Sequence, residues 1–276
     1  MDRLYALLSL LALAAIAAGA FVWSQYRAQP AIQPAAQTVP APSAPPSTSA
    51  EAPPESPIKY PIEAAPGPTP LPALEQSDPY VKDAFAALMG SKALSFLHID
   101  GLVRRMVATV DNLPRRIAPS RVWPVNQTPG HFSVVPGAQG LLVSPDNSLR
   151  YSPFVILVES VDTGRAVALY ASLYPLFQKA YEDLGTAGYF NDRLVSVIDH
   201  LLQTPDRAGP LEVQLTEVKG PVKSTQPWTR YRLSDPELES LSAGQKMLLR
   251  TGPVNERRLK AKLADIRARL AAAAPH

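Results

Sequence analysis

Proline is concentrated in one stretch of this chain, and that stretch limits how much of the chain can fold. Residues 30–72 hold 14 of the 30 prolines and very few large apolar side chains. Such a segment cannot bury enough apolar surface to offset the entropy lost on folding, and its prolines favour extended geometry. We therefore predict a disordered Pro/Ala-rich tether over residues 30–72. It separates an N-terminal segment, residues 1–29, from a single globular domain, residues 73–276.

The N-terminal segment is apolar and long enough to cross a bilayer. No charged residue lies between Leu4 and Tyr26, and residues 4–23 come close to the roughly 20 residues that a spanning helix needs. Arg3 and the N-terminal amine precede this stretch, and the tether beyond it has very few basic residues. By the positive-inside rule we predict a transmembrane anchor with its N-terminus in the cytoplasm and the domain outside the membrane.

A cleaved export signal is the alternative interpretation of this segment. Ala18-Gly19-Ala20 fits the small-x-small pattern of a cleavage site, so cleavage after Ala20 would release the rest of the chain. Trp23 and Tyr26, however, stand where aromatic residues anchor a spanning helix at the membrane interface. This placement favours a retained anchor, and either interpretation exports the domain.

The composition excludes several kinds of chemistry. Without cysteine, the chain has no thiolate metal site, iron–sulfur cluster, disulfide or cysteine nucleophile. The local motifs of serine hydrolases, zinc peptidases, P-loop proteins and dinucleotide-binding proteins are also missing. We therefore predict no metal site and no cofactor.

The basic charge is concentrated near the C-terminus. Residues 246–276 hold eight Lys and Arg against Glu256 and Asp265, in a chain whose net charge is +3, and contain no aromatic residue. Nucleic-acid-binding domains carry a wider basic surface, often with interleaved aromatic residues. We predict that the chain binds no nucleic acid.

The domain has the patterns of a mainly α (α+β) fold. Apolar spacing with capping and stop signals predicts helices over residues 78–89, 94–112, 164–185, 191–204 and 254–274. Pro175 lies inside the third of these and is expected to kink or divide it. A capping box at Ser234 and Glu237 predicts a further helix that continues to Leu249.

A small antiparallel β-sheet completes the predicted fold. Residues 211–216 and 229–233 alternate apolar and polar side chains, which is typical of half-buried strands, and Gly220-Pro221 lies between them. Residues 114–150 are rich in Pro, Gly, Asn and Ser, and we expect mostly loop there with short strands.

Two groups of side chains are candidate binding residues. Tyr170, Tyr174 and Tyr181 share one apolar stripe of a predicted helix; such a stripe is more often core than the wall of a ligand groove, and both interpretations stay open.

The second group is polar. Arg104, Arg105, Asp111 and Asn112 lie on or at the end of another predicted helix, where a surface role and a shared cleft are both open. The simplest partner for Arg104 is Asp100, four residues earlier.

The last predicted helix has a narrow apolar seam, formed by Leu259, Leu263, Ile266 and Leu270. Two heptads are short for a coiled coil, so we expect this helix to dock on its own domain. The alternative is pairing with a second copy, which would make the chain a homo-oligomer through its C-terminal helix.

Several motifs together resemble a bacterial, membrane-anchored family catalogued as a domain of unknown function (DUF3014). They are Val110-Asp111-Asn112-Leu113, Arg150-Tyr151, Leu173-Tyr174-Pro175-Leu176-Phe177, Ile198-Asp199-His200-Leu201-Leu202, and Gln245-Lys246-Met247-Leu248-Leu249-Arg250 followed by Gly252-Pro253 and Asn255. Thr251 departs from the pattern. The resemblance implies one domain in a bacterial envelope and brings no activity or catalytic residue with it.

These observations give two functional hypotheses. The first is a periplasmic binding or scaffolding module on a single-pass bacterial inner-membrane anchor, with an envelope protein or a cell-wall component as partner, because a tether raises the local concentration of a domain near its partner. The second is an envelope hydrolase that acts on cell-wall glycan or peptide through carboxylates.

Overall fold

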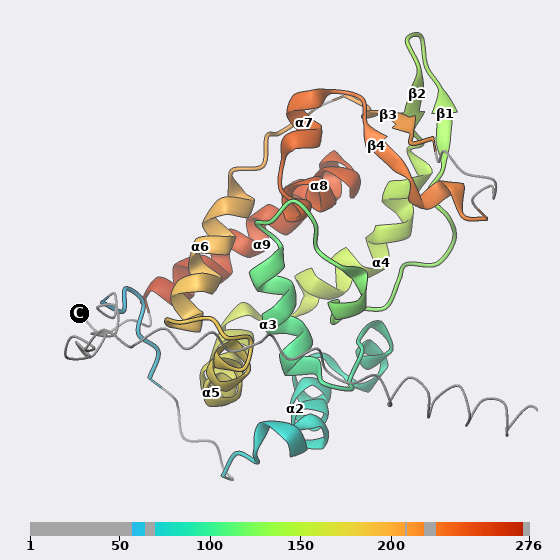
Figure 1. Cartoon of the computed structure of the whole chain (residues 1–276). Coiled ribbons are helices and arrows are strands. Elements are labelled where there is room, and N and C mark those ends of the chain that lie inside the picture. The colour runs from blue at the N-terminus through green and yellow to red at the C-terminus, as the bar shows by residue number, and fades with distance from the viewer. Residues whose placement is uncertain (1–56, 64–69, 208, 218–224, 273–276) are drawn as a thin grey trace, which may run out of the picture. The chain divides into compact units, whose positions relative to one another are not determined.

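The computed structural model describes residues 57–63, 70–207, 209–217 and 225–272. These residues are mainly helical with a small antiparallel sheet, which confirms the predicted fold class (Figure 1). The predicted membrane anchor and most of the predicted tether lie outside the described residues. Within the described residues, no helix has both the length and the apolar character needed to span a bilayer.

Most of the described chain is in α-helices. They are α2 (Asp78–Met89), α3 (Leu102–Asn112), α4 (Asp146–Ser160), α5 (Thr163–Glu182), α6 (Phe190–Leu202), α7 (Pro236–Ser240), α8 (Ala243–Arg250) and α9 (Pro253–Ala272). Short 3₁₀ turns occur at η1 (Leu74–Gln76), η2 (Ser91–Phe96), η3 (Ser120–Val122) and η4 (Pro227–Thr229). The largest core cluster is built from α2, α3, α5, α6 and α9, with Val81, Val103, Phe177, Phe190 and Leu270 among its buried residues.

The sheet has four antiparallel strands in the order β1 (Val134–Pro136), β2 (Leu141–Val143), β3 (Glu212–Leu215) and β4 (Tyr231–Leu233). The predicted pair is confirmed, with Val213 opposite Leu233. The sheet buries Val213 and Leu233 against α7 and α8, in a second core cluster with Leu238 and Leu249. In Figure 1 it lies at the far end of the domain from α2 and α5.

The helix predicted over residues 94–112 is divided into η2 and α3. Gly101, immediately before α3, has a φ of +64°, a left-handed conformation that cannot continue an α-helix. The carboxylate of Asp78 fixes this turn by accepting a hydrogen bond of 2.8 Å from the Gly101 N–H. A contact with another helix therefore decides where α3 begins.

Two proline-containing helices also differ from expectation. The sequence patterns do not predict α4, whose first turns lie in the stretch expected to be mostly loop. Pro175 does not divide α5, which is continuous from Thr163 to Glu182. Pro175 costs the helix one backbone hydrogen bond. Its neighbours Tyr174, Leu176 and Phe177, however, are all buried in the main core. Their burial outweighs that loss.

The helix predicted from Ser234 to Leu249 consists of α7 and α8. Asp235 caps α7 by accepting from the Glu237 N–H at 2.9 Å, and the capping box lies instead at Ser242 and Gln245, where α8 starts. Gly244 then brings α8 close to the core, since a Cβ there would lie 2.6 Å from Leu201 Cδ2.

The C-terminal helix α9 docks on its own domain, as predicted for its apolar seam. It packs mainly against α4 and α6, and Leu270 is fully buried while Leu263 and Ile266 pack on the same core. Its cations pair with acids of other segments: Arg258 contacts Glu159, Lys260 contacts Asp206 at 2.7 Å, and Arg267 contacts Asp199 at 2.9 Å. Much of the basic charge of this helix is thus neutralised within the domain.

Candidate functional site

The four polar candidate residues, Arg104, Arg105, Asp111 and Asn112, have separate partners in the structure. Arg104 forms ion pairs with Glu75 at 2.7 Å and Asp183 at 3.4 Å. The predicted partner was Asp100, and this prediction was wrong. Arg105 donates to the main-chain carbonyls of Asp100 and Arg121. Asn112 donates to the Ala108 carbonyl of its own helix at 2.7 Å. These three side chains hold turns and helix ends together.

Asp111 is the buried member of this predicted group. Its side chain is 8% exposed and accepts from Arg115 on one oxygen and from Nε of Arg193 at 3.1 Å on the other. Arg193 also donates to the Asp111 main-chain carbonyl at 2.9 Å. Asp111 therefore ties α3 to α6, and both of its carboxylate oxygens are paired with arginines.

The three predicted tyrosines are brought close together on α5. The rings of Tyr170 and Tyr174 lie 5.7 Å apart edge to face, and Tyr181 packs against Phe190 at 5.4 Å. Burial raises the pKa of all three hydroxyls, and the neighbouring Tyr189 adds to the rise at Tyr170 and Tyr174. All three hydroxyls therefore stay protonated at neutral pH, and those of Tyr170 and Tyr174 form hydrogen bonds.

The tyrosine cluster continues into a surface site at the start of α6. Tyr174 packs against the ring of Tyr189 at 5.1 Å and accepts a hydrogen bond from the Asn191 N–H. Tyr170 donates to the Asn191 side-chain oxygen at 3.3 Å, which leaves the Asn191 amide nitrogen free to donate elsewhere. Tyr189, Asn191 and the neighbouring Asp192 form what we call the strap-binding site.

Residues 59–62, here called the strap, occupy this site. They belong to the segment predicted as tether, and the structure places them beside α6 (Figure 1). The Asp192 carboxylate accepts from the main-chain N–H of Lys59 at 2.9 Å and of Tyr60 at 2.7 Å. Asn191 donates to the Tyr60 carbonyl at 2.8 Å.

Tyr189 holds the other end of the strap. Its hydroxyl accepts from the Ile62 N–H at 2.9 Å and donates to the Ile62 carbonyl at 3.2 Å. The Ile62 side chain, 8% exposed, is part of the main core, and the Arg267 guanidinium lies 6.0 Å from the centre of the Tyr60 ring. Asp199 positions that guanidinium through two hydrogen bonds.

The chemistry of this site is recognition of main-chain groups in a segment that bends at Lys59 and Tyr60. Three N–H groups and two carbonyls of this four-residue segment are satisfied by side chains of one helix end. As in other peptide-binding sites, the main-chain bonds supply affinity and the side-chain contacts supply specificity.

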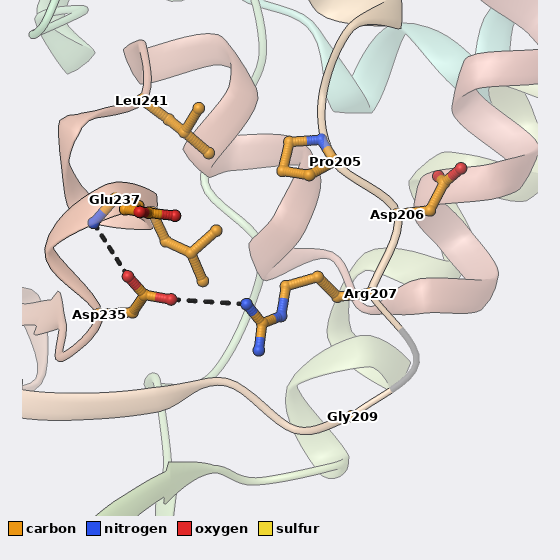
Figure 2. A pocket seen from close by; sticks show the side chains of 8 residues that line it. Pro205, Asp206, Arg207, Gly209, Asp235, Glu237 and Leu241 are labelled. Atoms are coloured by element: carbon orange, nitrogen blue, oxygen red, sulfur yellow. Dashed lines mark hydrogen bonds and ion pairs between the residues drawn. The ribbon is translucent and has the colours of Figure 1, made fainter.

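Apart from the strap-binding site, a hollow of about 490 Å³ lies between α7 and the segment that follows α6. Figure 2 shows Asp235 facing Arg207, at 3.5 Å, while Asp206 points away from both. Lys260 lowers the pKa of Asp206 through a hydrogen bond and its charge. A general acid needs a raised pKa, so Asp206 does not fit that role, and Asp235 is already bonded to Arg207 and the Glu237 N–H.

Two further buried ionisable residues, Glu256 and Lys246, do not belong to a metal site in the described part of the chain. Among the described residues no cluster of three His, Asp or Glu side chains is arranged to hold a metal ion. Burial raises the pKa of Glu256, and Lys260, 3.2 Å away, opposes that rise. Lys246 is also buried and donates to the carboxylate and the carbonyl of Glu239, which ties α8 to α7.

A comparison with protein families finds one match. The model of the family described as "Protein of unknown function (DUF3014)" matches residues 102–267, well over half of the chain. The chain belongs to the DUF3014 family. Comparisons with curated proteins and with solved structures found no significant match.

The DUF3014 region contains the strap-binding site but not the strap. Tyr189, Asn191 and Asp192 lie inside the matched residues, and residues 59–62 precede them. Three DUF3014 motifs recognised in the sequence have structural roles close to this site or to the core: Asp111 joins α3 to α6, Tyr174 supports Tyr189, and Asp199 positions Arg267.

Two of the tyrosines that support this site in the DUF3014 protein were predicted from its sequence as candidate binding residues, but the site itself was not. Tyr170 and Tyr174 back it, while Tyr189, Asn191 and Asp192 were not predicted as binding residues. One signal was present. Residues 58–62, Ile-Lys-Tyr-Pro-Ile, bring large apolar side chains into a tether that otherwise has few, and such a cluster indicates a segment able to dock.

Proposed function

We propose that this chain is a membrane-tethered binding or scaffolding module of the bacterial cell envelope. The observation that carries the proposal is the fastening of the strap, residues 59–62, to the domain by five hydrogen bonds through the strap main chain. This fastening fixes the point at which the proline-rich spacer leaves the domain, and with it the face of the domain that lies next to the spacer. A fixed exit point suits a module that presents the opposite face to a partner.

The rest of the proposal concerns location. Residues 4–23 would form a single-pass anchor in the inner membrane with the N-terminus in the cytoplasm, and the domain would lie in the periplasm. A reporter fused after His276 tests this: activity of a periplasm-dependent reporter supports the topology, and activity confined to a cytoplasm-dependent reporter contradicts it.

The partner in this proposal is an envelope protein or a cell-wall component. Tethering raises the effective concentration of a domain near such a partner without any new contact. The test is to cross-link cells that produce the tagged full-length chain, purify it from membranes and identify the attached molecules by mass spectrometry, with a chain of residues 1–72 as control. A reproducible protein or cell-wall partner supports the module, whereas wall fragments that the purified chain cleaves would favour the hydrolase alternative.

A further inference from the structure

We propose that the strap-binding site is a peptide-recognition site whose resident ligand is the chain's own strap, so that the site is self-occupied and opens to a peptide of the same chemistry when the strap is displaced. This inference deepens the proposed function, on which it rests, by naming the class of ligand. The ligand is a peptide segment with an aromatic residue, a proline and a large aliphatic residue in succession, as in Tyr60-Pro61-Ile62.

The main-chain contacts define the backbone that the site accepts. Asp192 binds two consecutive N–H groups, those of Lys59 and Tyr60, with its two oxygens, and Tyr189 binds the N–H of Ile62. The position between them is Pro61, which has no N–H to leave unsatisfied and which disfavours helix in the residue before it. A proline therefore fits the one position whose amide has no partner in these contacts.

Two side-chain contacts add specificity. Ile62 fills a buried position in the main core, and the Tyr60 ring lies beside the Arg267 guanidinium at 6.0 Å, within range of a cation–π contact. At the other edge Lys59 is exposed and Ile58 is 53% exposed. A competing peptide thus has to supply the aromatic and the aliphatic residue, while the residues before them are less constrained.

Self-occupancy follows from the short connection between strap and domain. Only residues 63–73 separate the strap from η1, which begins at Leu74. A short connection gives the strap an effective concentration at its site in the millimolar range. A partner peptide of equal affinity has to exceed this concentration to displace the strap. The proposed module would therefore bind its partner only when the strap is pulled away or outcompeted.

The test measures binding of a fluorescent peptide of residues 57–63, Pro-Ile-Lys-Tyr-Pro-Ile-Glu, to the full-length chain in detergent. In the variant Ile62→Asp the strap loses its buried side chain and vacates the site. We expect this variant to bind the peptide at least tenfold more tightly than the wild-type chain. Adding Asp192→Ala to the variant should abolish the gain, and a peptide that itself carries Ile62→Asp should not bind.

Equal binding by the wild-type chain and by Ile62→Asp, including no binding by either, would overturn the inference. Because Ile62→Asp disturbs the core, its fold is checked by circular dichroism, and Tyr60→Ala serves as a second variant that leaves Ile62 in place. We expect Tyr60→Ala also to bind the peptide more tightly than the wild-type chain does.

A proteolysis experiment tests self-occupancy without altering the strap. Trypsin cleaves after Lys59 only when the amides of Lys59 and Tyr60 leave Asp192. We expect Asp192→Ala to speed this cleavage at least tenfold. Asp206→Ala, which removes a carboxylate that lines the hollow beside α7, should leave the cleavage rate unchanged. Equal rates in all three chains would contradict an occupied site.

These assays and the cross-linking experiment fail independently. A cross-linked partner in cells without peptide binding in vitro would refute this inference and leave the scaffold proposal intact. Peptide binding without any cross-linked partner would support the recognition site and refute the scaffold.

Discussion

The hydroxyl of Tyr189 accepts a hydrogen bond from the main-chain N–H of Ile62 and donates one to the carbonyl of the same residue, across 127 positions of sequence. One side chain thus satisfies both main-chain groups of a residue in a segment that its composition predicts to be unfolded. Its ring is held by Tyr174 on α5, so the predicted tyrosine stripe serves as the support of this contact.

Tyr189→Phe is expected to loosen the strap while leaving the aromatic packing in place. It removes two hydrogen bonds, each of which contributes about 0.5–1.5 kcal/mol to stability, so we expect a loss of about 1–2 kcal/mol in the free energy of unfolding. Urea denaturation measures this. Tyr80→Phe, on α2, is the matched control, and a loss as large in the control would assign the effect to tyrosine removal in general.

Asp111→Asn is expected to weaken the junction of α3 and α6. The substitution keeps the shape but removes the charge that faces Arg115 and Arg193, in a position that is only 6% exposed. Removing one partner of a buried charge pair typically costs about 3–5 kcal/mol; because Arg193 keeps some solvent contact, we expect about 2–4 kcal/mol.

Asp265→Asn provides the comparison for Asp111→Asn, since Asp265 also pairs with an arginine, Arg269, but on the surface of α9. Surface pairs of this kind contribute little to stability. Unfolding midpoints in urea should therefore differ clearly between the two variants, and equal midpoints would show that Asp111 is not the central residue of the junction.

Gly244→Ala is expected to push α8 away from Leu201 and Leu113, against which it packs. An added Cβ would lie 2.6 Å from Leu201 Cδ2 and 3.1 Å from Leu113 Cβ, which are contacts that require a shift of the core. Overpacking of this kind destabilises by about 1–3 kcal/mol. Gly140→Ala, where nothing lies within 4 Å of the added atom, should change the thermal midpoint much less; a similar drop in both would contradict close packing at α8.

Glu256→Gln is expected to remove a pH dependence of stability. Burial raises the pKa of Glu256 in the folded state above its ordinary value of 4.5. The folded chain then holds this proton more tightly than the unfolded chain, so the stabilising contribution is full below pH 4.5 and is lost as the pH rises through the folded-state pKa. At pH 7 the glutamine variant should therefore have the higher thermal midpoint, although the contact with Lys260 opposes this gain.

Glu75→Gln should have the opposite effect, a lower thermal midpoint than the wild-type chain at pH 7. The pKa of Glu75 is lowered by a hydrogen bond to its own main chain and by Arg104, so its contribution is present at neutral pH and is lost as the pH falls below 4.5. Thermal melts of both variants from about pH 2 to pH 7 check the two signs, because the Glu75 contribution is lost only below pH 4.5. A Glu256→Gln midpoint that falls relative to wild type at pH 7 would show that the ion pair with Lys260 outweighs burial.

Local sequence patterns alone were enough to predict α2, α6 and α9. Each has apolar residues at helical spacing and a clear start or stop, such as Asp78-Pro79 before α2 and Gly90 after it. The pairing of β3 with β4 and the docking of the α9 seam were predicted in the same way, from the periods of two and of 3.6 residues that a buried face requires.

Contacts between distant segments decided the rest. The division of residues 94–112 depends on Asp78 reaching Gly101, and the partners of Arg104, Glu75 and Asp183, lie 29 and 79 residues away. The separation of α7 from α8 places Gly244 against Leu201 and Leu113. No local period encodes such contacts, because they depend on which surfaces meet once the helices have packed.

The strap shows the same division in a single site. Its composition determines that it forms neither helix nor core by itself, and that prediction follows from entropy against apolar burial. The apolar side chains of residues 58–62 mark a segment able to dock, but where it docks was decided by the tertiary structure. Tyr189, Asn191 and Asp192 bind main-chain groups that every residue carries, so the sequence does not identify them as its partners.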